Sequence, residues 1–144
     1  MGVYHRLVRI GFLLHNFLRR PQLYRVRCAI FYQGEILLVR HVGGANEWSL
    51  PGGGIHRNET PIIAAEREVW EELKLTVSNL RELEHMRVTH KYVTTDNVLV
   101  RGEATMRKLR RRKWELQAAE WFTLDDLPTP LSPTAKRVID ITKS

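Results

Sequence analysis

The sequence contains one cysteine and no long apolar segment. Because Cys28 has no second cysteine to pair with, an intrachain disulfide is excluded, and its apolar surroundings indicate a buried thiol in a reducing compartment. No apolar run approaches about 18 residues, so no membrane-spanning helix is expected. Arg9 interrupts the first apolar region and no small-residue cleavage site follows, unlike in a secretory signal. We therefore expect a cytoplasmic location.

Acidic residues are fewer than basic ones. The 144 residues include 23 lysines and arginines against 16 aspartates and glutamates, which gives a formal net charge of +7. This excess permits attraction to phosphates, RNA or an acidic membrane surface, and by itself selects none of them. The length suits one domain that can bury a substantial core.

Residues 1–20 are predicted to form a basic amphipathic helix that precedes one domain over residues 21–144. Apolar residues recur at helical spacing, arginines lie between them, and Pro21 ends the pattern. The apolar stripe favours packing onto the domain or onto a partner subunit, so the helix is a candidate element of a homodimer. Attachment to a membrane surface is the minority alternative.

Apolar runs predict the strands of the domain. Two runs at 26–32 and 35–41 are joined by Gln33-Gly34, which predicts a hairpin. Two more at 82–94 and 97–104 are predicted to turn at Thr95-Asp96. A last strand is expected near residue 119, and Ser132 is expected to cap a closing helix over 134–141.

The most informative stretch is a run of glycines at 52–54 followed by a short helical pattern. Thr60 and Pro61 suit the start of the helix, with proline near its first position. A stripe of apolar residues at helical period is expected to face the core: Ile62, Ala65, Val69 and Leu73.

Three glutamates occupy one face of the same predicted helix. Glu68, Glu71 and Glu72 stand at i, i+3 and i+4, so their side chains project together. Like charges at this spacing repel one another. Bound cations such as Mg²⁺ explain so dense a set better than a solvated surface, since hard divalent ions take carboxylate oxygens.

The stretch resembles the Nudix box of the Nudix (MutT-like) hydrolases, whose pattern is G-x5-E-x7-R-E-U-x-E-E-x-G-U with U aliphatic. W-x-L-P-G-G-G from Trp48 and W-F-x-x-x-x-L-P from Trp121 are also similar to the family. The resemblance implies an α/β fold, a Nudix-type α/β/α sandwich with a mixed β-sheet flanked by helices. The box positions that match, with the supporting glycines of the turn, are Gly52, Gly53, Gly54, Glu59, Arg67, Glu68, Val69, Glu71, Glu72 and Leu75.

What the resemblance implies for function is Mg²⁺-dependent hydrolysis, with Mn²⁺ as a substitute, of a nucleoside diphosphate linked to another moiety. In this reading the substrate is a small nucleotide-type molecule. Glu68 and Glu72 are the first choices for metal ligands, and Glu71 follows, directly or through water. The backbone carbonyl of Gly53 or of its neighbour would supply a further ligand. The general base is one of these glutamates or a loop glutamate.

Arg67 and Glu59 are expected to support this site. Arg67 stands at i,i+4 from Glu71 and can fix that carboxylate in one rotamer. Glu59 precedes the helix and is expected to tether the glycine turn to it, although an acid at a helix N-terminus is favoured by the dipole alone.

Nudix proteins often add an acid from outside the box, and Glu115 is the candidate here. Glu103 and Glu120 are lesser options, and for each of the three a solvated surface position is an equal alternative. Other side chains are weaker candidates for contacts with substrate, and packing or surface positions are favoured for them: His41, His85, His90, Trp48 and Tyr92.

Two features leave the substrate open. Between Arg107 and Lys113 six of seven residues are basic, which is typical of a solvated, mobile loop and, less often, of polyphosphate or RNA capture. Removal of pyrophosphate from RNA 5′ ends is therefore one alternative. Lys74 stands where the family has glycine, which motivates a second alternative, a binding or regulatory protein with weak turnover.

Overall fold

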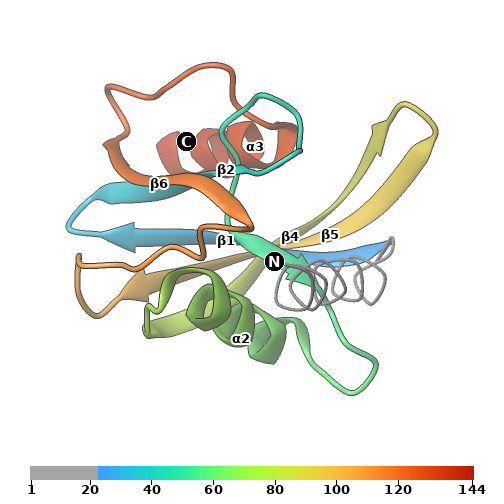
Figure 1. Cartoon of the computed structure of the whole chain (residues 1–144), viewed down its shortest axis with the longest axis horizontal. Coiled ribbons are helices and arrows are strands. Elements are labelled where there is room, and N and C mark those ends of the chain that lie inside the picture. Colours follow the sequence, from blue (N-terminus) through green and yellow to red (C-terminus); the bar gives the residue numbers. More distant parts are fainter. Residues whose placement is uncertain (1–22) are drawn as a thin grey trace, which may run out of the picture.

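The computed structural model describes residues 23–144, so the helix expected over residues 1–20 lies outside the described residues. The described chain forms a mixed six-stranded sheet with a helix on each face (Figure 1). This arrangement confirms the predicted α/β/α sandwich. The elements in chain order are β1 (Tyr24–Tyr32), β2 (Glu35–His41), β3 (Gly52–Gly54), α2 (Pro61–Leu73), β4 (Val77–His90), β5 (Val93–Ala104), β6 (Leu116–Thr123) and α3 (Pro133–Lys143).

Strand β1 lies at the centre of the sheet, whose order is β4-β5-β1-β2-β6. It pairs parallel with β5 along most of its length, and antiparallel with β2 only near the connecting turn. Along its first half β3 takes the place of β2, with Val26 opposite Gly53. The glycine run is therefore part of the sheet, and its backbone is held in register with β1.

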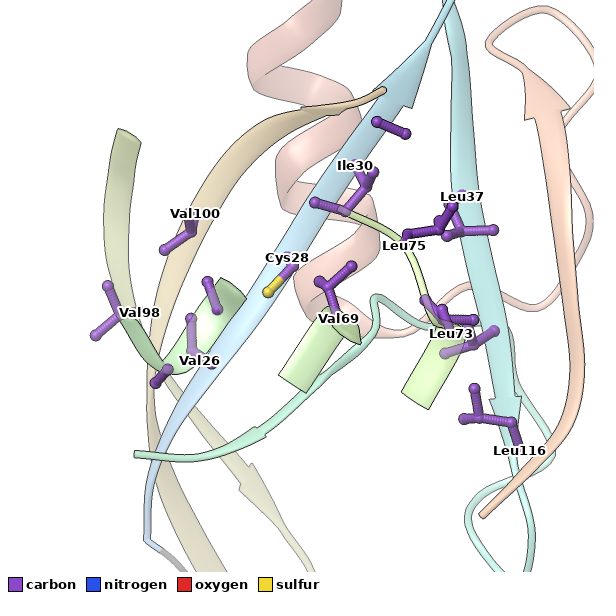
Figure 2. Packing of buried hydrophobic residues seen from close by; sticks show 14 of the residues in the cluster. Val26, Cys28, Ile30, Leu37, Val69, Leu73, Leu75, Val98, Val100 and Leu116 are labelled. Atoms are coloured by element: carbon purple, nitrogen blue, oxygen red, sulfur yellow. The ribbon is translucent and has the colours of Figure 1, made fainter. Parts of the chain in front are cut away.

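The core has two parts, one on each face of the sheet. Along β1 the side chains alternate, so that Val26, Cys28 and Ile30 face α2 whereas Ala29 and Phe31 face α3. Figure 2 shows the α2 side, where Val69 and Leu73 of the helix meet β1 and its neighbours. The apolar stripe predicted for the helix is confirmed, since Ala65, Val69 and Leu73 are buried and Ile62 packs against them.

Cys28 is a free thiol with no exposed surface, as its apolar surroundings predicted. Burial is the main cause that raises the pKa of this thiol, and the nearby charges of Glu72 and Glu68 act in the same direction. The group therefore remains a thiol across the physiological pH range.

The turn between β4 and β5 differs from the prediction. It falls at Lys91-Tyr92, where Lys91 has a φ of 55°, and not at Thr95-Asp96. Asp96 lies within β5 because it pairs with Tyr24 of β1 and with Arg87 of β4. Strand β4 also begins earlier than predicted, at Val77. Neighbouring strands on both sides thus decide where this hairpin turns.

The predicted β1–β2 turn and the predicted cap of α3 are confirmed. Gln33 and Gly34 both have positive φ and close the β1–β2 hairpin. Ser132 caps α3, where its hydroxyl accepts a hydrogen bond from the Ala135 amide at 3.2 Å. No helix among residues 23–144 is long and apolar enough to cross a membrane.

Candidate active site

Helix α2 buries two of its glutamates. Thr60 caps the helix by accepting a hydrogen bond from the Ile63 amide at 3.2 Å, and Pro61 follows as its first residue. From this start, Glu68 and Glu72 fall one turn apart on the inner side and are only 2% and 1% exposed. Ionised carboxylates are among the most costly groups to bury, so this placement needs an explanation other than packing.

The glycine run is fitted to Glu68. A Cβ on Gly53 would lie 2.5 Å from Glu68 Oε1, so the carboxylate occupies the space of the missing side chain. Gly52 has a φ of 147°, and a Cβ there would lie 2.1 Å from the carbonyl oxygen of Val26. Glycine at both positions lets the backbone of β3 lie directly between β1 and the carboxylate.

Arg67 ties the turn to the helix. Its Nε and Nη2 donate to the two oxygens of Glu59 at 2.6 and 2.8 Å, and Nη2 also donates to the carbonyl oxygen of Gly54 at 3.0 Å. Nη1 donates to Glu68 Oε1 at 2.9 Å and lies 3.4 Å from Glu71 Oε2. Its main partner is Glu59, and the contact with Glu71 is the longest of the set.

The Arg67–Glu59 pair is strongly ionic. The hydrogen bond from Arg67 is the largest cause that lowers the pKa of Glu59 to about 2, and the His56 amide adds a second hydrogen bond at 2.9 Å. Glu59 thus joins the loop after β3 to the helix through both of its oxygens.

The pKa of Glu72 is shifted in the opposite direction to that of Glu59. Burial is the largest cause that raises its pKa well above the usual range, followed by the charge of Glu68, and the charge of Glu115 adds to it. Arg27 on β1 opposes this shift only in part. Neither carboxylate oxygen of Glu72 accepts a hydrogen bond from a donor within residues 23–144. The site therefore packs two carboxylates together, with Arg67 paired to Glu68 and the oxygens of Glu72 left without a donor among residues 23–144.

The acidic side chains predicted for the site do not all lie close together. Glu71 is partly exposed and turns towards Arg67, with 31% of its side chain accessible. Glu115 lies before β6 on the Glu72 side, 3.6 Å from Arg112. Glu103 and Glu120 are exposed on β5 and β6. Among the described residues no three histidine, cysteine, aspartate or glutamate side chains are close enough to hold a metal ion by themselves.

A cleft of about 730 Å³ opens beside Glu68. It is lined by the glycines of β3, the start of β1, the β4–β5 hairpin, the loop after β2 and the start of α3. His41, His90 and Tyr92 line it, whereas His85 and Trp48 do not. Sequence reasoning missed several lining side chains, among them Arg25, Arg27, Glu47, His56 and Asn97.

The two missed arginines carried a signal in the sequence. Arg25 and Arg27 alternate along β1 with the buried Val26 and Cys28, so a strand must present them on the face opposite α2. Burial is the main cause that lowers the pKa of Arg27, and the charges of Glu72 and Glu68 act against it. Arg27 thus interacts electrostatically with the two buried carboxylates, while its Nη1 donates to the carbonyl oxygen of Leu50 at 3.4 Å.

The basic segment 107–113 lies against the end of α2 and does not line the cleft. The amides of Arg110 and Arg112 donate to the carbonyl oxygens of Leu73 and Glu72 at 2.9 and 2.7 Å. These bonds satisfy carbonyl groups that a helix end leaves without partners. The segment is irregular and mostly exposed, as a solvated loop would be, but its main chain is tied to the helix.

Lys74 ends the helix in the conformation that glycine would adopt. Its φ and ψ are 53° and 37°, and its amide donates to the carbonyl oxygen of Trp70 at 2.9 Å. Its ammonium group lies 5.2 Å from the centroid of the Trp70 ring. The departure from the family pattern leaves the helix end in place.

Comparisons with known proteins agree with this geometry. The family model described as NUDIX domain matches residues 22–140. An RNA pyrophosphohydrolase of Psychrobacter cryohalolentis is 34% identical over 95 residues, 64% of this chain and 49% of that protein. A MutT-like protein of Streptomyces ambofaciens is 30% identical over 109 residues, which cover 74% of this chain and 68% of the relative.

The fold also has solved counterparts. The crystal structure of a MutT NUDIX hydrolase from Burkholderia pseudomallei superimposes with a TM-score of 0.74 at 26% identity, covering 81% of this chain and 95% of that one. The chain spans about half the length of the RNA pyrophosphohydrolases it matches first, 49% in the Psychrobacter cryohalolentis protein.

Proposed function

This chain belongs to the NUDIX family, and we propose that it is a Mg²⁺-dependent pyrophosphohydrolase that cleaves a nucleoside diphosphate linked to another moiety. The observation that carries the proposal is the buried pair Glu68 and Glu72, of which Glu68 lies against Gly53 and lines a cleft together with two arginines. Buried acids next to a cationic cleft are what a divalent ion and a phosphate chain would need from a protein.

The acid pair fits a divalent cation. Both oxygens of Glu72 are buried without a hydrogen bond from the described chain, and Glu68 adds a second charge beside them. Mg²⁺ is usually bound through one or two carboxylates together with water and substrate phosphates, so two buried acids suffice. Glu68, Glu72 and a backbone carbonyl at Gly53 or its neighbour would hold the ion. Glu71 and Glu115 would add ligands through water, and Mn²⁺ would substitute.

When bound, the cation would lower the pKa of a coordinated water molecule and neutralise phosphate oxygens. Side chains of the protein would position the acid and the substrate. Arg67 orients Glu68 through Nη1 and braces Glu59 and Gly54, so the acid is held in one rotamer. Arg25 and Arg27 line the cleft and would attract and orient the anionic substrate.

The relatives favour a second candidate substrate, the 5′ end of RNA. Several of them are RNA pyrophosphohydrolases, and the segment from Arg107 to Lys113 would supply a basic surface for the strand. Since the segment lies outside the cleft, its role would be to hold RNA beyond the reacting phosphates.

The test is a panel of substrates with Mg²⁺: nucleoside triphosphates, ADP-ribose, NADH, dinucleoside polyphosphates and 5′-triphosphorylated RNA. Glu72→Gln should abolish hydrolysis, whereas Glu66→Gln, an exposed acid on the same helix, should leave it unchanged. Activity retained in Glu72→Gln would refute the assignment of the acid pair. If the wild-type chain binds these molecules but cleaves none, it is a binding protein.

A charge variant separates the two substrate classes. Replacing the exposed Lys108, Arg110 and Lys113 with glutamine should weaken RNA cleavage and its salt dependence but not the cleavage of small nucleotides. The matched control replaces Lys136, Arg137 and Lys143, three exposed basic residues of α3, with glutamine. An equal effect of both sets on RNA would argue against a role for the segment.

A further inference from the structure

We propose that the cleft binds a guanine base between the tip of the β4–β5 hairpin and the loop that follows β2, with Tyr92 stacking on the base and Glu47 accepting hydrogen bonds from its N–H groups. The inference rests on the proposed function, because it names the base of the nucleotide whose pyrophosphate bond would be cleaved.

The cleft has room for a base next to the reacting phosphates. Its volume of about 730 Å³ is in the range of pockets that enclose whole small molecules. Tyr24 at the start of β1 pairs with Asp96, so the hairpin residues before Asp96 extend beyond the sheet's central strand. The glycines of β3 lie beside Arg25 and Arg27 instead. A phosphate chain at the glycines would therefore leave the hairpin end of the cleft free for the rest of the nucleotide.

Tyr92 lies at that tip, and side-chain hydrogen bonds between β4 and β5 stabilise the hairpin below it. Its side chain is fully exposed, and no aromatic ring among the described residues contacts it. Below it, the hydroxyl groups of Thr89 and Thr94 are 2.9 Å apart, and Arg87 donates to Asp96 at 2.9 Å. An aromatic ring that lines a cleft and packs on nothing offers a free face for a planar base.

Trp48, the other aromatic candidate, already packs against side chains of the protein. Trp48 packs against Phe122 with ring centroids 5.0 Å apart, and the Arg40 guanidinium lies 5.6 Å from its centroid. Its backbone is also fixed, because its amide donates to Pro130 and its carbonyl accepts from Ser132. Trp48 thus serves as an anchor for its neighbour Glu47.

Glu47, on the loop after β2, lines the same cleft, and the chemistry of its carboxylate favours guanine over adenine. It is partly buried, and no residue of 23–144 donates a hydrogen bond to its carboxylate or forms an ion pair with it. An ionised carboxylate only accepts hydrogen bonds. Guanine carries two adjacent N–H donors, at N1 and N2, that match its two oxygens, whereas adenine places a ring acceptor next to its amino group.

The test measures KM and kcat of the full chain for GTP and ATP with Mg²⁺. The wild type should prefer GTP. Tyr92→Ala should raise KM for both nucleotides on the order of tenfold with kcat little changed, and Tyr92→Phe should restore KM. Hydrolysis of inorganic triphosphate, which has no base, should not respond to Tyr92→Ala. Trp114→Ala is the matched control, since Trp114 is exposed and does not line the cleft.

Glu47→Gln tests the choice of base. Glutamine offers one donor and one acceptor, which suit adenine, so the preference for GTP over ATP should fall by about tenfold or reverse. The same contrast with 5′-triphosphorylated oligonucleotides that begin with guanosine or adenosine shows whether the base belongs to a free nucleotide or to an RNA end. A preference that does not change in Glu47→Gln would overturn the proposal.

Equilibrium binding of GMP and AMP separates this inference from the proposed function, because it needs no turnover. If the chain hydrolyses nothing but binds GMP more tightly than AMP through Glu47, the proposed function fails and the base site stands. If the chain hydrolyses nucleotides and KM is unchanged in Tyr92→Ala and Glu47→Gln, the proposed function stands and the base site fails. Equal binding of GMP and AMP by the wild type also overturns the base site.

Discussion

The carboxylate of Glu68 fills the space that a side chain on Gly53 would occupy, with 2.5 Å between Oε1 and an ideal Cβ. The turn and the helix are therefore fitted to each other across 15 residues of sequence. Arg67 completes the fit, since it donates both to Glu68 and to the carbonyl oxygen of Gly54.

Gly53→Ala should displace the Glu68 carboxylate and reduce kcat about 100-fold, because a shift of about 1 Å in a catalytic group has that effect. Stability should fall little, since the displaced group is the end of a side chain. The control is Gly102→Ala, where the new Cβ would meet a methyl group of Leu80 at 2.6 Å and where no glutamate of α2 is among the nearest neighbours. Hydrolysis assays and thermal unfolding of both variants are the measurements. An equal loss of activity in the two variants would contradict the close fit between Gly53 and Glu68.

Glu59→Gln should lower the free energy of unfolding by about 2 kcal/mol at pH 7, the scale of hydrogen bonds to charged groups. The folded pKa of Glu59 is about 2, below its ordinary value of 4.5. Its contribution is therefore complete above pH 4.5 and is lost as the pH falls towards 2. Urea unfolding of both proteins from pH 7 to pH 3 should show their difference shrinking with acid. A difference that is constant over this range would be inconsistent with the ion pair.

Glu72→Gln should stabilise the metal-free protein by about 1 kcal/mol at pH 7 while reducing activity more than about 100-fold. The raised pKa of Glu72 means that ionisation opposes folding above the ordinary value of 4.5, and glutamine removes that charge. Unfolding in EDTA measures the first effect. Added Mg²⁺ should raise the Tm of the wild type and of Glu66→Gln but not of Glu72→Gln. Equal Mg²⁺ shifts in all three would place the ion elsewhere.

Lys74→Gly should stabilise the protein by about 0.5 to 1 kcal/mol and leave kcat unchanged, because glycine adopts the left-handed conformation of this position without steric cost. Lys74→Ala separates the backbone from the side chain, since alanine retains the steric cost and loses the contact with Trp70. Chemical denaturation should rank glycine above lysine and lysine at or above alanine. A destabilised glycine variant would mean that the contact with Trp70 outweighs the backbone term.

The sequence predicted the helix that carries the candidate acids, but not which of these acids are buried and which are exposed. Spacing put Glu68, Glu71 and Glu72 on one face. Glu68 and Glu72 are buried with the apolar side of α2, whereas Glu71 stays partly exposed beside Arg67. The main partner of Arg67 is Glu59, which stands eight residues away. The inner side of α2 also mixes acids with apolar residues, so the acidic face and the core face overlap at Glu68 and Glu72.

Long-range pairing explains the remaining differences. Lys91-Tyr92 has no typical turn residue, and the hairpin turns there because β5 must align Asp96 with both Arg87 and Tyr24. The cleft gathers Arg25, Glu47 and Tyr92 from three separate segments. Only the arginines had a local signal, the alternation along β1, whereas the loop and the hairpin tip are positioned by strands distant in the sequence.

The buried thiol of Cys28 gives the protein an internal reporter of opening. It is the sole cysteine of the chain and has no exposed surface in the layer between β1 and α2. A thiol reagent can therefore react only when that layer separates, and its labelling rate under native conditions measures how often separation occurs. Because α2 also carries the acid pair, an ion that holds the helix to β3 should slow the labelling, without any substrate having to be known.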